Sequence, residues 1–122
     1  MPTILIVDDE YLIADILGYA LEDEGYKAFT ASNGKRALEI FDSESPALVI
    51  TDFMMPGMNG LELAQKIRSH ASLGSVPILL MSGAQGGVGR ATPELFNAVY
   101  DKPFDINKVV ARIRELVPLD PD

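Results

Sequence analysis

Polar side chains stand at the ends of several apolar segments of this chain. Asp8 and Asp9 follow the first segment, Asp52 ends a later one, and Ser82 and Lys102 end two more. Parallel α/β sheets place their functional sites at the carboxyl ends of the strands. If these segments are parallel strands, three carboxylates, a hydroxyl and an amine converge at one edge of the sheet.

The chemistry of this group depends on its three carboxylates, which raise one another's pKa unless a cation lies nearby. Oxygen ligands without histidine or cysteine suit Mg²⁺ or Mn²⁺ and not zinc. Lysine and serine side chains bind phosphate oxygens, and a carboxylate can attack phosphorus to give an aspartyl phosphate. The group therefore indicates a magnesium-assisted phosphoryl transfer to an aspartate.

The elements that must position these residues alternate between strand and helix. Short apolar runs predict strands over residues 3–7, 26–31, 47–51 and 77–82, with a weaker fifth at 97–102. Apolar residues at helical spacing predict helices over 13–21 before Gly25, over 37–41, from an Asn59 N-cap to Ala71, and from an Asp105 N-cap to residue 117. This alternation predicts an α/β fold with a parallel sheet and helices on both faces.

The segment before the fifth strand, "SGAQGGVGRATPELF", does not fit the alternation because it is rich in glycine and contains Pro93. Each glycine costs a helix about 1 kcal/mol relative to alanine, and an interior proline costs about 3 kcal/mol. We therefore expect a loop with at most a short helix around Thr92 to Phe96, and so a shortened or irregular fourth helix.

Length and composition indicate a single acidic domain. The chain has 122 residues, and we expect a domain over residues 1–118 and a frayed tail over 119–122. Its 18 acidic and 10 basic residues give a net charge of −8, which disfavours direct nucleic-acid binding. The absence of cysteine excludes disulfides and fits a reducing compartment.

The chain also lacks sequence signals for a membrane. No apolar run approaches the roughly 20 residues of a membrane span. The start, Met1-Pro2-Thr3, lacks the basic segment of a signal peptide. We therefore expect a cytoplasmic protein that does not insert into membranes.

Four motifs together resemble the receiver domain of response regulators in two-component signalling. They are "ILIVDDE", "VITDFMMPGMNGLEL", "PILLMSG" and "DKPF", and they span nearly the whole chain in the family's order. An acid pair, a "DxxMPxxxG" loop, a strand-ending serine and a Lys-Pro in that order form a specific set. The resemblance implies a flavodoxin-like, doubly wound sheet of five parallel strands in the order 2-1-3-4-5.

The resemblance also implies roles for the acidic residues. Asp52 matches the phosphoacceptor. Asp8 and Asp9 match the magnesium-binding pair, with Asp52 itself and the backbone carbonyl of Met54 as further ligands. The implied cofactor is Mg²⁺, for which Mn²⁺ is a possible substitute. Glu10 either tunes access to the metal or only favours the start of the following helix.

The remaining site residues match the family's phosphoryl-binding positions. Ser82 matches the serine or threonine that bonds the phosphoryl group, and Lys102 matches the lysine that pairs with a phosphoryl oxygen. The family's Lys-Pro peptide is usually cis, so the resemblance implies a cis Lys102-Pro103 bond.

One position departs from the family pattern. The family usually carries Tyr or Phe three residues before the lysine, as a rotating switch, but here that residue is Val99 and Tyr100 follows it. On a strand, a shift by one residue moves a side chain to the other face of the sheet. The standard coupling between Ser82 and an aromatic ring is therefore in question.

The function implied by the resemblance is a phosphorylatable signalling switch. A histidine kinase or a histidine phosphotransfer protein would donate the phosphoryl group, and an unknown downstream protein would read the active state. Such a receiver catalyses its own phosphorylation and dephosphorylation and is not a turnover enzyme. The alternative is a pseudo-receiver, a protein-binding module that acts independently of phosphorylation. A phosphatase of the haloacid dehalogenase type fits poorly, because its nucleophile follows the first strand in a "DxD" motif.

Overall fold

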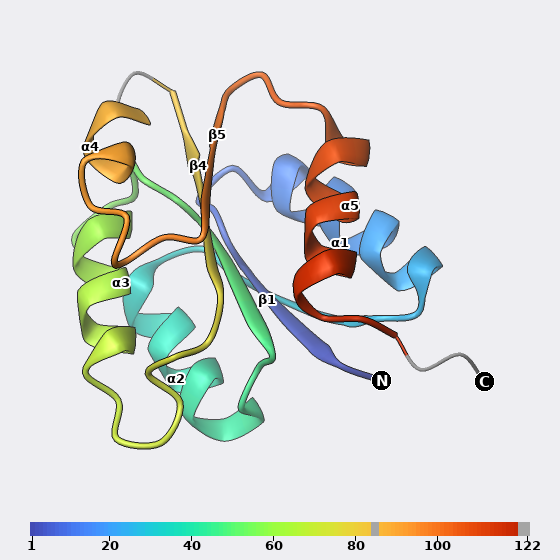
Figure 1. The fold of residues 1–122 in the computed structure, drawn as a ribbon, viewed down its shortest axis with the longest axis horizontal. Coiled ribbons are helices and arrows are strands. Elements are labelled where there is room, and N and C mark those ends of the chain that lie inside the picture. The colour runs from blue at the N-terminus through green and yellow to red at the C-terminus, as the bar shows by residue number, and fades with distance from the viewer. Residues whose placement is uncertain (84–85, 120–122) are drawn as a thin grey trace.

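The computed structural model describes residues 1–83 and 86–119, and its strands form one five-stranded parallel sheet. The strands are β1 (Thr3–Val7), β2 (Lys27–Ala31), β3 (Leu48–Asp52), β4 (Ile78–Ser82) and β5 (Ala98–Asp101). Their order is β2-β1-β3-β4-β5, as predicted (Figure 1). The flavodoxin-like architecture is therefore confirmed.

The strand register brings the carboxyl ends of the central strands to one edge. The aligned pairs at this edge are Val7 with Thr51, Asp52 with Met81, and Ser82 with Asp101. The predicted polar residues therefore lie at, or directly after, neighbouring strand ends.

Helices cover both faces of the sheet (Figure 1). One face carries α1 (Tyr11–Glu24) and α5 (Ile106–Leu116), and the other carries α2 (Gly34–Glu44), α3 (Gly60–Arg68) and α4 (Gly86–Arg90). Every residue of β3 and β4 is buried, as expected for central strands of a parallel sheet. Among the described helices, none combines the length and hydropathy needed to cross a membrane.

Two helix boundaries show why the local sequence folds as predicted. Gly25 follows α1 with a φ of 111°, a left-handed conformation that glycine adopts without steric cost. The start of α3 is a capping box, in which Glu62 N donates to Asn59 Oδ1 at 2.9 Å and Asn59 N donates to Glu62 Oε1 at 3.0 Å. This cap fixes where the chain leaves the loop after Asp52.

The short helix α4, of 5 residues, confirms the predicted shortened fourth helix but corrects its position in the glycine-rich segment. The helix lies at Gly86–Arg90, whereas the predicted position, Thr92 to Phe96, is not helical. A Cβ added to Gly89 would lie 2.5 Å from Leu80 Cδ2 and 2.9 Å from Val99 Cγ2. Glycine here permits close packing of α4 on the sheet, and this tertiary contact outweighs the low helix propensity.

One further helix boundary differs from the prediction. Helix α3 ends at Arg68, before the predicted end at Ala71. Leu119, predicted to begin a frayed tail, packs against the cluster beneath α1 and α5. Residues 120–122 of that tail lie outside the described residues, and the domain boundary at 118 stays a prediction.

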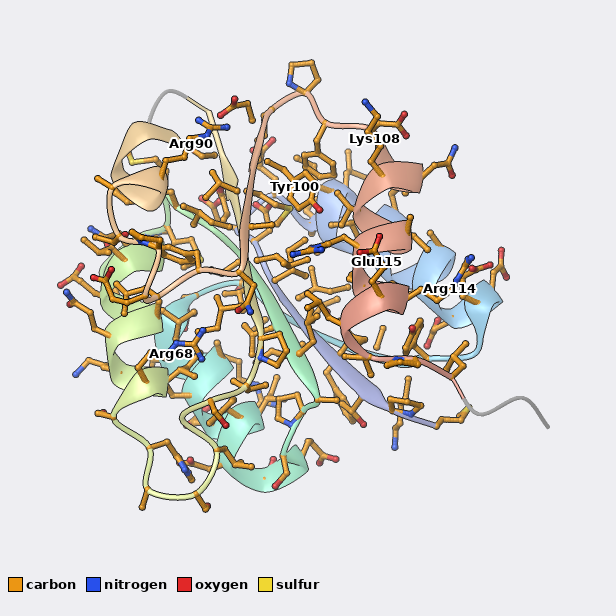
Figure 2. All side chains as sticks on the ribbon, viewed as in Figure 1. Arg68, Arg90, Tyr100, Lys108, Arg114 and Glu115 are labelled. Carbon is orange, nitrogen blue, oxygen red and sulfur yellow. The ribbon has the colours of Figure 1, made fainter. Side chains whose placement is uncertain are left out.

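Arg68, at the end of α3, forms hydrogen bonds with two loops that precede β4 and β5 (Figure 2). Its guanidinium donates to Leu95 O at 2.8 Å and to Asn97 Oδ1 at 3.4 Å. It also donates to Gly74 O at 2.9 Å and to Val76 O. Burial lowers the pKa of Arg68. Backbone carbonyls therefore satisfy this half-buried cation.

Candidate functional site

The candidate site is a group of buried polar side chains at the carboxyl edge of the sheet. Asp8 directly follows β1, while Asp52 and Ser82 are the last residues of β3 and β4. All three residues are buried among otherwise apolar neighbours. Burying charged groups is costly unless other groups compensate them.

Lys102 supplies the compensating charge by contacting three carboxylates. Its Nζ lies 3.4 Å from Asp8 Oδ2, 3.2 Å from Glu10 Oε1 and 3.2 Å from Asp52 Oδ1. The Lys102-Pro103 peptide is cis, as the resemblance implied. One ammonium group therefore serves three acids contributed by two different strand ends and the start of α1.

The buried acids are not fully compensated by this lysine. Burial raises the pKa of Asp8 from 3.8 to about 6, and the charge of Asp52 adds to this rise. A bond from Glu10 N to Asp8 Oδ1, 2.9 Å long, acts in the opposite direction, as does Lys102. Burial also raises the pKa of Asp52, against the lowering effect of Lys102. The site thus favours binding of additional positive charge.

The pKa of Lys102 also depends on the opposing effects of burial and of the neighbouring acids. Burial lowers this pKa, but the charges of Asp52 and Asp8 outweigh burial and raise it above its usual value. Lys102 is therefore charged at neutral pH and is held in place by its acidic partners.

Ser82 has a hydroxyl that is ready to accept a partner. Its Oγ is buried and, among the residues that the structure describes, makes no hydrogen bond. An unsatisfied buried polar group costs about 1–3 kcal/mol. A phosphoryl oxygen placed between Ser82 and Lys102 would remove that cost, which fits the role implied for Ser82.

The carboxylates that come together differ in one member from the predicted metal ligands. Oxygen atoms of Asp8, Glu10 and Asp52 all lie within 4.8 Å of one another. This donor set contains only carboxylate oxygens, which suits Mg²⁺. The ligand roles of Asp9 and of the Met54 carbonyl stay predictions.

Asp9 lines a different surface pocket from Glu10. Its side chain is exposed beside a surface pocket formed by residues 32–35 and 56–58. It is close enough for its charge to contribute to the raised pKa of Asp52. Sequence reasoning underrated Glu10, for which the available signal was an acid directly following the Asp8-Asp9 pair.

Val99 and Tyr100 lie on opposite faces of β5, as their adjacent positions predict. Val99 is aligned with Leu80 and packs in the cluster beneath α2 and α3. Tyr100 packs on the α1 and α5 side, where Figure 2 shows it near α5. Gly89 of α4 packs closely over Val99, because a Cβ added to Gly89 would lie 2.9 Å from Val99 Cγ2.

Comparison with protein families identifies the whole arrangement. The family model of the response regulator receiver domain matches residues 4–114, which include Asp8, Asp52, Ser82 and Lys102. The matched range covers all of the sheet except Thr3, and most of α5.

Individual relatives agree with the family match. Sporulation initiation phosphotransferase F of Bacillus subtilis is 34% identical over 116 residues, covering 95% of this chain and 94% of that protein. Sensory transduction protein RegX3 of Mycobacterium tuberculosis is 30% identical over 119 residues, which cover 96% of this chain. The chain spans about half of RegX3, namely 51% of its length.

Solved structures show the same fold. The response regulator TrrA of Thermotoga maritima, crystallised with Mg²⁺ and BeF, is 34% identical with a TM-score of 0.83, over 96% of this chain and all of that one. The chemotaxis regulator CheY4 of Vibrio cholerae is 24% identical with a TM-score of 0.86, over 96% of this chain and 99% of that one, and it supports the fold alone.

Proposed function

Because this chain belongs to the response regulator receiver domain family of two-component signalling, we propose that it is a switch phosphorylated on Asp52. The observation that carries the proposal is the buried Asp52 carboxylate, which lies 3.2 Å from Lys102 and shares a strand-end edge with Ser82. Within the described part of the chain, the Ser82 hydroxyl has no hydrogen-bond partner. The buried acids Asp8 and Asp52 belong to a cluster of carboxylate oxygens that fits both phosphorylation and Mg²⁺ binding.

In the proposed reaction, an oxygen of Asp52 attacks the phosphorus of a phosphohistidine on the donor. A P–O bond forms as the P–N bond breaks, and the leaving imidazole keeps the electron pair and takes up a proton. Lys102 pairs with one phosphoryl oxygen, and Ser82 donates a hydrogen bond to another. In dephosphorylation, water attacks phosphorus, and the Asp52 carboxylate leaves as inorganic phosphate is released.

Mg²⁺ is the cofactor that we propose for this reaction, and Mn²⁺ is a substitute of the same ligand preference. When bound, the ion supplies positive charge that offsets the negative charge on the phosphoryl oxygens. Asp8 and Asp52 would hold it, together with Asp9 and the carbonyl of Met54. The all-oxygen donor set supports this assignment, and so does the Mg²⁺ complex of TrrA.

The proposed donor is a histidine kinase or a histidine phosphotransfer protein, and the reader of the active state is a further protein. Exposed apolar side chains near the site support a protein partner, since they gather on α1 at Tyr11, Leu12, Ile16 and Tyr19. We propose that the receiver catalyses its own phosphorylation and dephosphorylation and turns over no other substrate. A cytoplasmic location completes the proposal, supported by the absence of cysteine.

A pseudo-receiver is the second candidate, and the packing at position 99 favours it. Val99 cannot swing as a ring does, and α4 already occupies the space above it. A partner that binds the free and the phosphorylated chain equally would support this candidate, since such a ligand cannot report the switch.

Intact mass after incubation with acetyl phosphate tests whether Asp52 accepts a phosphoryl group. Wild type and Asp52→Asn would be compared, each with and without Mg²⁺. The switch predicts one phosphate adduct that requires both Mg²⁺ and Asp52. An adduct on Asp52→Asn, or no adduct on wild type, would contradict the assignment of Asp52.

A further inference from the structure

We propose that Glu10 is a latch that holds Lys102 in the resting state and competes with the phosphoryl group for it. This inference rests on the proposed function, because the competitor is the phosphoryl group on Asp52. Glu10 is a positioning residue in this scheme, since it acts through Lys102.

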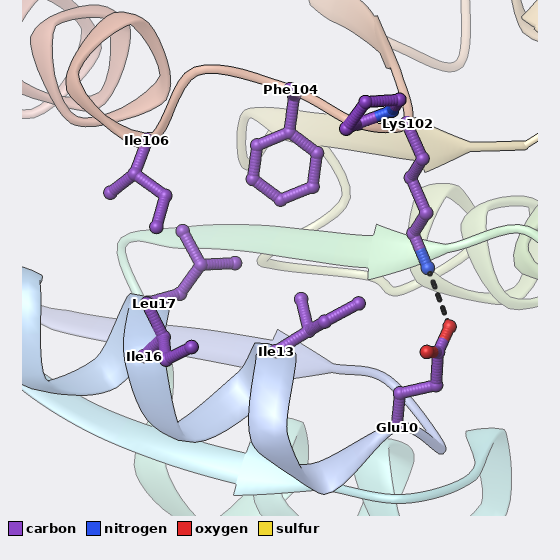
Figure 3. Close-up of a pocket in the computed structure, with 8 residues that line it drawn as sticks. Glu10, Ile13, Ile16, Leu17, Lys102, Phe104 and Ile106 are labelled. Carbon is purple, nitrogen blue, oxygen red and sulfur yellow. Dashed lines mark hydrogen bonds and ion pairs between the residues drawn. The ribbon is translucent and has the colours of Figure 1, made fainter.

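The first observation is that the Glu10 side chain does not cap its own helix. Glu10 occupies the N-cap position of α1, yet its side chain makes no capping hydrogen bond. Its carboxylate turns instead to Lys102, 92 positions away in the sequence, and lies 3.2 Å from Nζ. Figure 3 shows this pair at one end of the apolar pocket between α1 and the segment after β5. Favouring the helix start therefore does not account for where this side chain lies.

The second observation is the number of donors on Lys102. An ammonium group has three N–H donors, and three carboxylates lie within 3.4 Å of Nζ. Every donor is therefore engaged in the resting state. Phosphorylation turns the Asp52 carboxylate into an acyl phosphate, and a phosphoryl oxygen takes over the donor that Asp52 held. For Lys102 to give the phosphoryl group a second donor, Asp8 or Glu10 must give up its share.

The third observation identifies Glu10 as the partner that leaves. The Asp8 side chain is fully buried and the Asp52 side chain is 6% exposed, whereas the Glu10 side chain is 62% exposed. An exposed carboxylate that loses its ion-pair partner is solvated by water, so the loss costs little free energy. A buried carboxylate that loses its partner is left uncompensated, which is costly. Asp8 is held in addition by the backbone N–H of Glu10. Glu10 is therefore the carboxylate that gives up its contact with Lys102.

The latch also connects two elements that flank the pocket. Glu10 stands at the start of α1, and Lys102 precedes the cis Pro103 in the segment that leads to α5. Releasing Glu10 frees the end of a pocket of about 390 Å³ lined by Ile13, Leu17 and Phe104. Phosphorylation at Asp52 would thereby change the surface between α1 and α5, away from α4 and Val99.

Two substitutions separate the latch from a general charge effect. Glu10→Gln removes the charge and the ion pair. Glu10→Asp keeps the charge, but aspartate is a strong N-cap residue, so its shorter side chain turns to the helix N–H groups and away from Lys102. Glu39→Gln is the matched control, because Glu39 is similarly exposed and loses a comparable pair with Arg36 at 3.3 Å.

The measurement is the midpoint of binding of beryllofluoride, a phosphoryl analogue, at saturating Mg²⁺, with Mg²⁺ affinity measured separately by calorimetry. We expect Glu10→Gln and Glu10→Asp to tighten beryllofluoride binding about two- to five-fold, the range for one exposed ion pair. We expect both to leave Mg²⁺ affinity within about two-fold, and Glu39→Gln to change neither quantity.

Three results would overturn the latch. In the first, Glu10→Gln leaves beryllofluoride binding unchanged or weakens it. In the second, Glu10→Asp behaves as wild type, which would make the effect one of charge alone. In the third, Glu10→Gln weakens Mg²⁺ binding ten-fold, which would make Glu10 a metal ligand. If wild type itself binds neither Mg²⁺ nor beryllofluoride, the proposed function fails before the latch is reached.

Discussion

Two half-buried cations flank β5, and the structure neutralises them in different ways. Arg68 lies near the amino end of β5 and donates to backbone carbonyls and the Asn97 side chain. Lys102 lies at the carboxyl end and contacts three carboxylates, two of them on buried residues. Around Arg68 neutral acceptors meet one cation, whereas around Lys102 three acids share one ammonium group.

This difference indicates that Arg68 stabilises the fold, whereas the polar groups around Lys102 can still be satisfied by a ligand. The contacts of Arg68 join three segments through the backbone carbonyls of Gly74, Val76 and Leu95. At the other end, burial raises the pKa of Asp8, and the Ser82 hydroxyl has no hydrogen-bond partner among the residues that the structure describes. Under-compensated buried groups of this kind concentrate at functional sites.

The comparison predicts its largest effect for Arg68→Ala. The substitution removes the donor from the part-buried hydrogen bonds to the carbonyls of Gly74, Val76 and Leu95, so the free energy of unfolding should fall by about 3 kcal/mol. Urea denaturation measures this change. Phosphorylation of the remaining folded protein by acetyl phosphate should persist, since Arg68 lies at the far end of β5.

Arg36→Ala is the matched control for Arg68. It removes an arginine whose ion pair with Glu39 is exposed, so stability should change by no more than about 0.5 kcal/mol. Equal losses for the two arginines would contradict the view that Arg68 organises the amino end of β5.

A smaller effect is expected at Gly89 in α4. Gly89→Ala places a Cβ against Leu80 and Val99, which should cost about 1–2 kcal/mol of unfolding free energy. Combining it with Val99→Ala should cost less than the sum of the two single changes, because the smaller side chain makes room.

Gly87→Ala, in the same helix, should change the free energy of unfolding in the opposite direction. Among the described residues a Cβ there meets no atom within 4 Å. The higher helix propensity of alanine should therefore stabilise the protein by up to about 1 kcal/mol. Destabilisation by both changes, or by neither, would show that close packing is not what places glycine at 89.

Much of the fold followed from the sequence because its signals are local. Continuous apolar runs ending at Asp8, Asp52 and Ser82 predict buried parallel strands and their functional edge. Gly25 and Asn59 mark helix ends by conformations and hydrogen bonds that involve their immediate neighbours.

The features that escaped prediction depend on residues far apart in the chain. Helix α4 forms where propensity disfavours it because Gly89 fits against Leu80 and Val99. Arg68 binds backbone carbonyls, which leave no sequence pattern. Glu10 shows its partner only when α1 and the end of β5 are brought together.

The charge imbalance at the site sets the direction of the pH dependence. The pKa of Asp8 is raised to about 6, so the folded state binds this proton more tightly than the unfolded state. The resulting stability is present below about pH 4 and is lost as pH rises to about 6. The raised pKa of Asp52 also adds stability at low pH that is lost as pH rises. The raised pKa of Lys102 has the same effect on stability, but at higher pH. Without metal, Asp8→Asn should therefore exceed wild type by about 1–2 kcal/mol at pH 7.

The most direct test is the free energy of unfolding of wild type and Asp8→Asn at pH 7, measured across a Mg²⁺ titration. Without Mg²⁺, Asp8→Asn should be the more stable protein. Wild type should then gain about 1.4 kcal/mol for each ten-fold rise in Mg²⁺ above its dissociation constant. Asp8→Asn should gain much less, so the two curves should cross. If wild type is the more stable protein without metal and Mg²⁺ stabilises both equally, the carboxyl edge is not an under-compensated cation site.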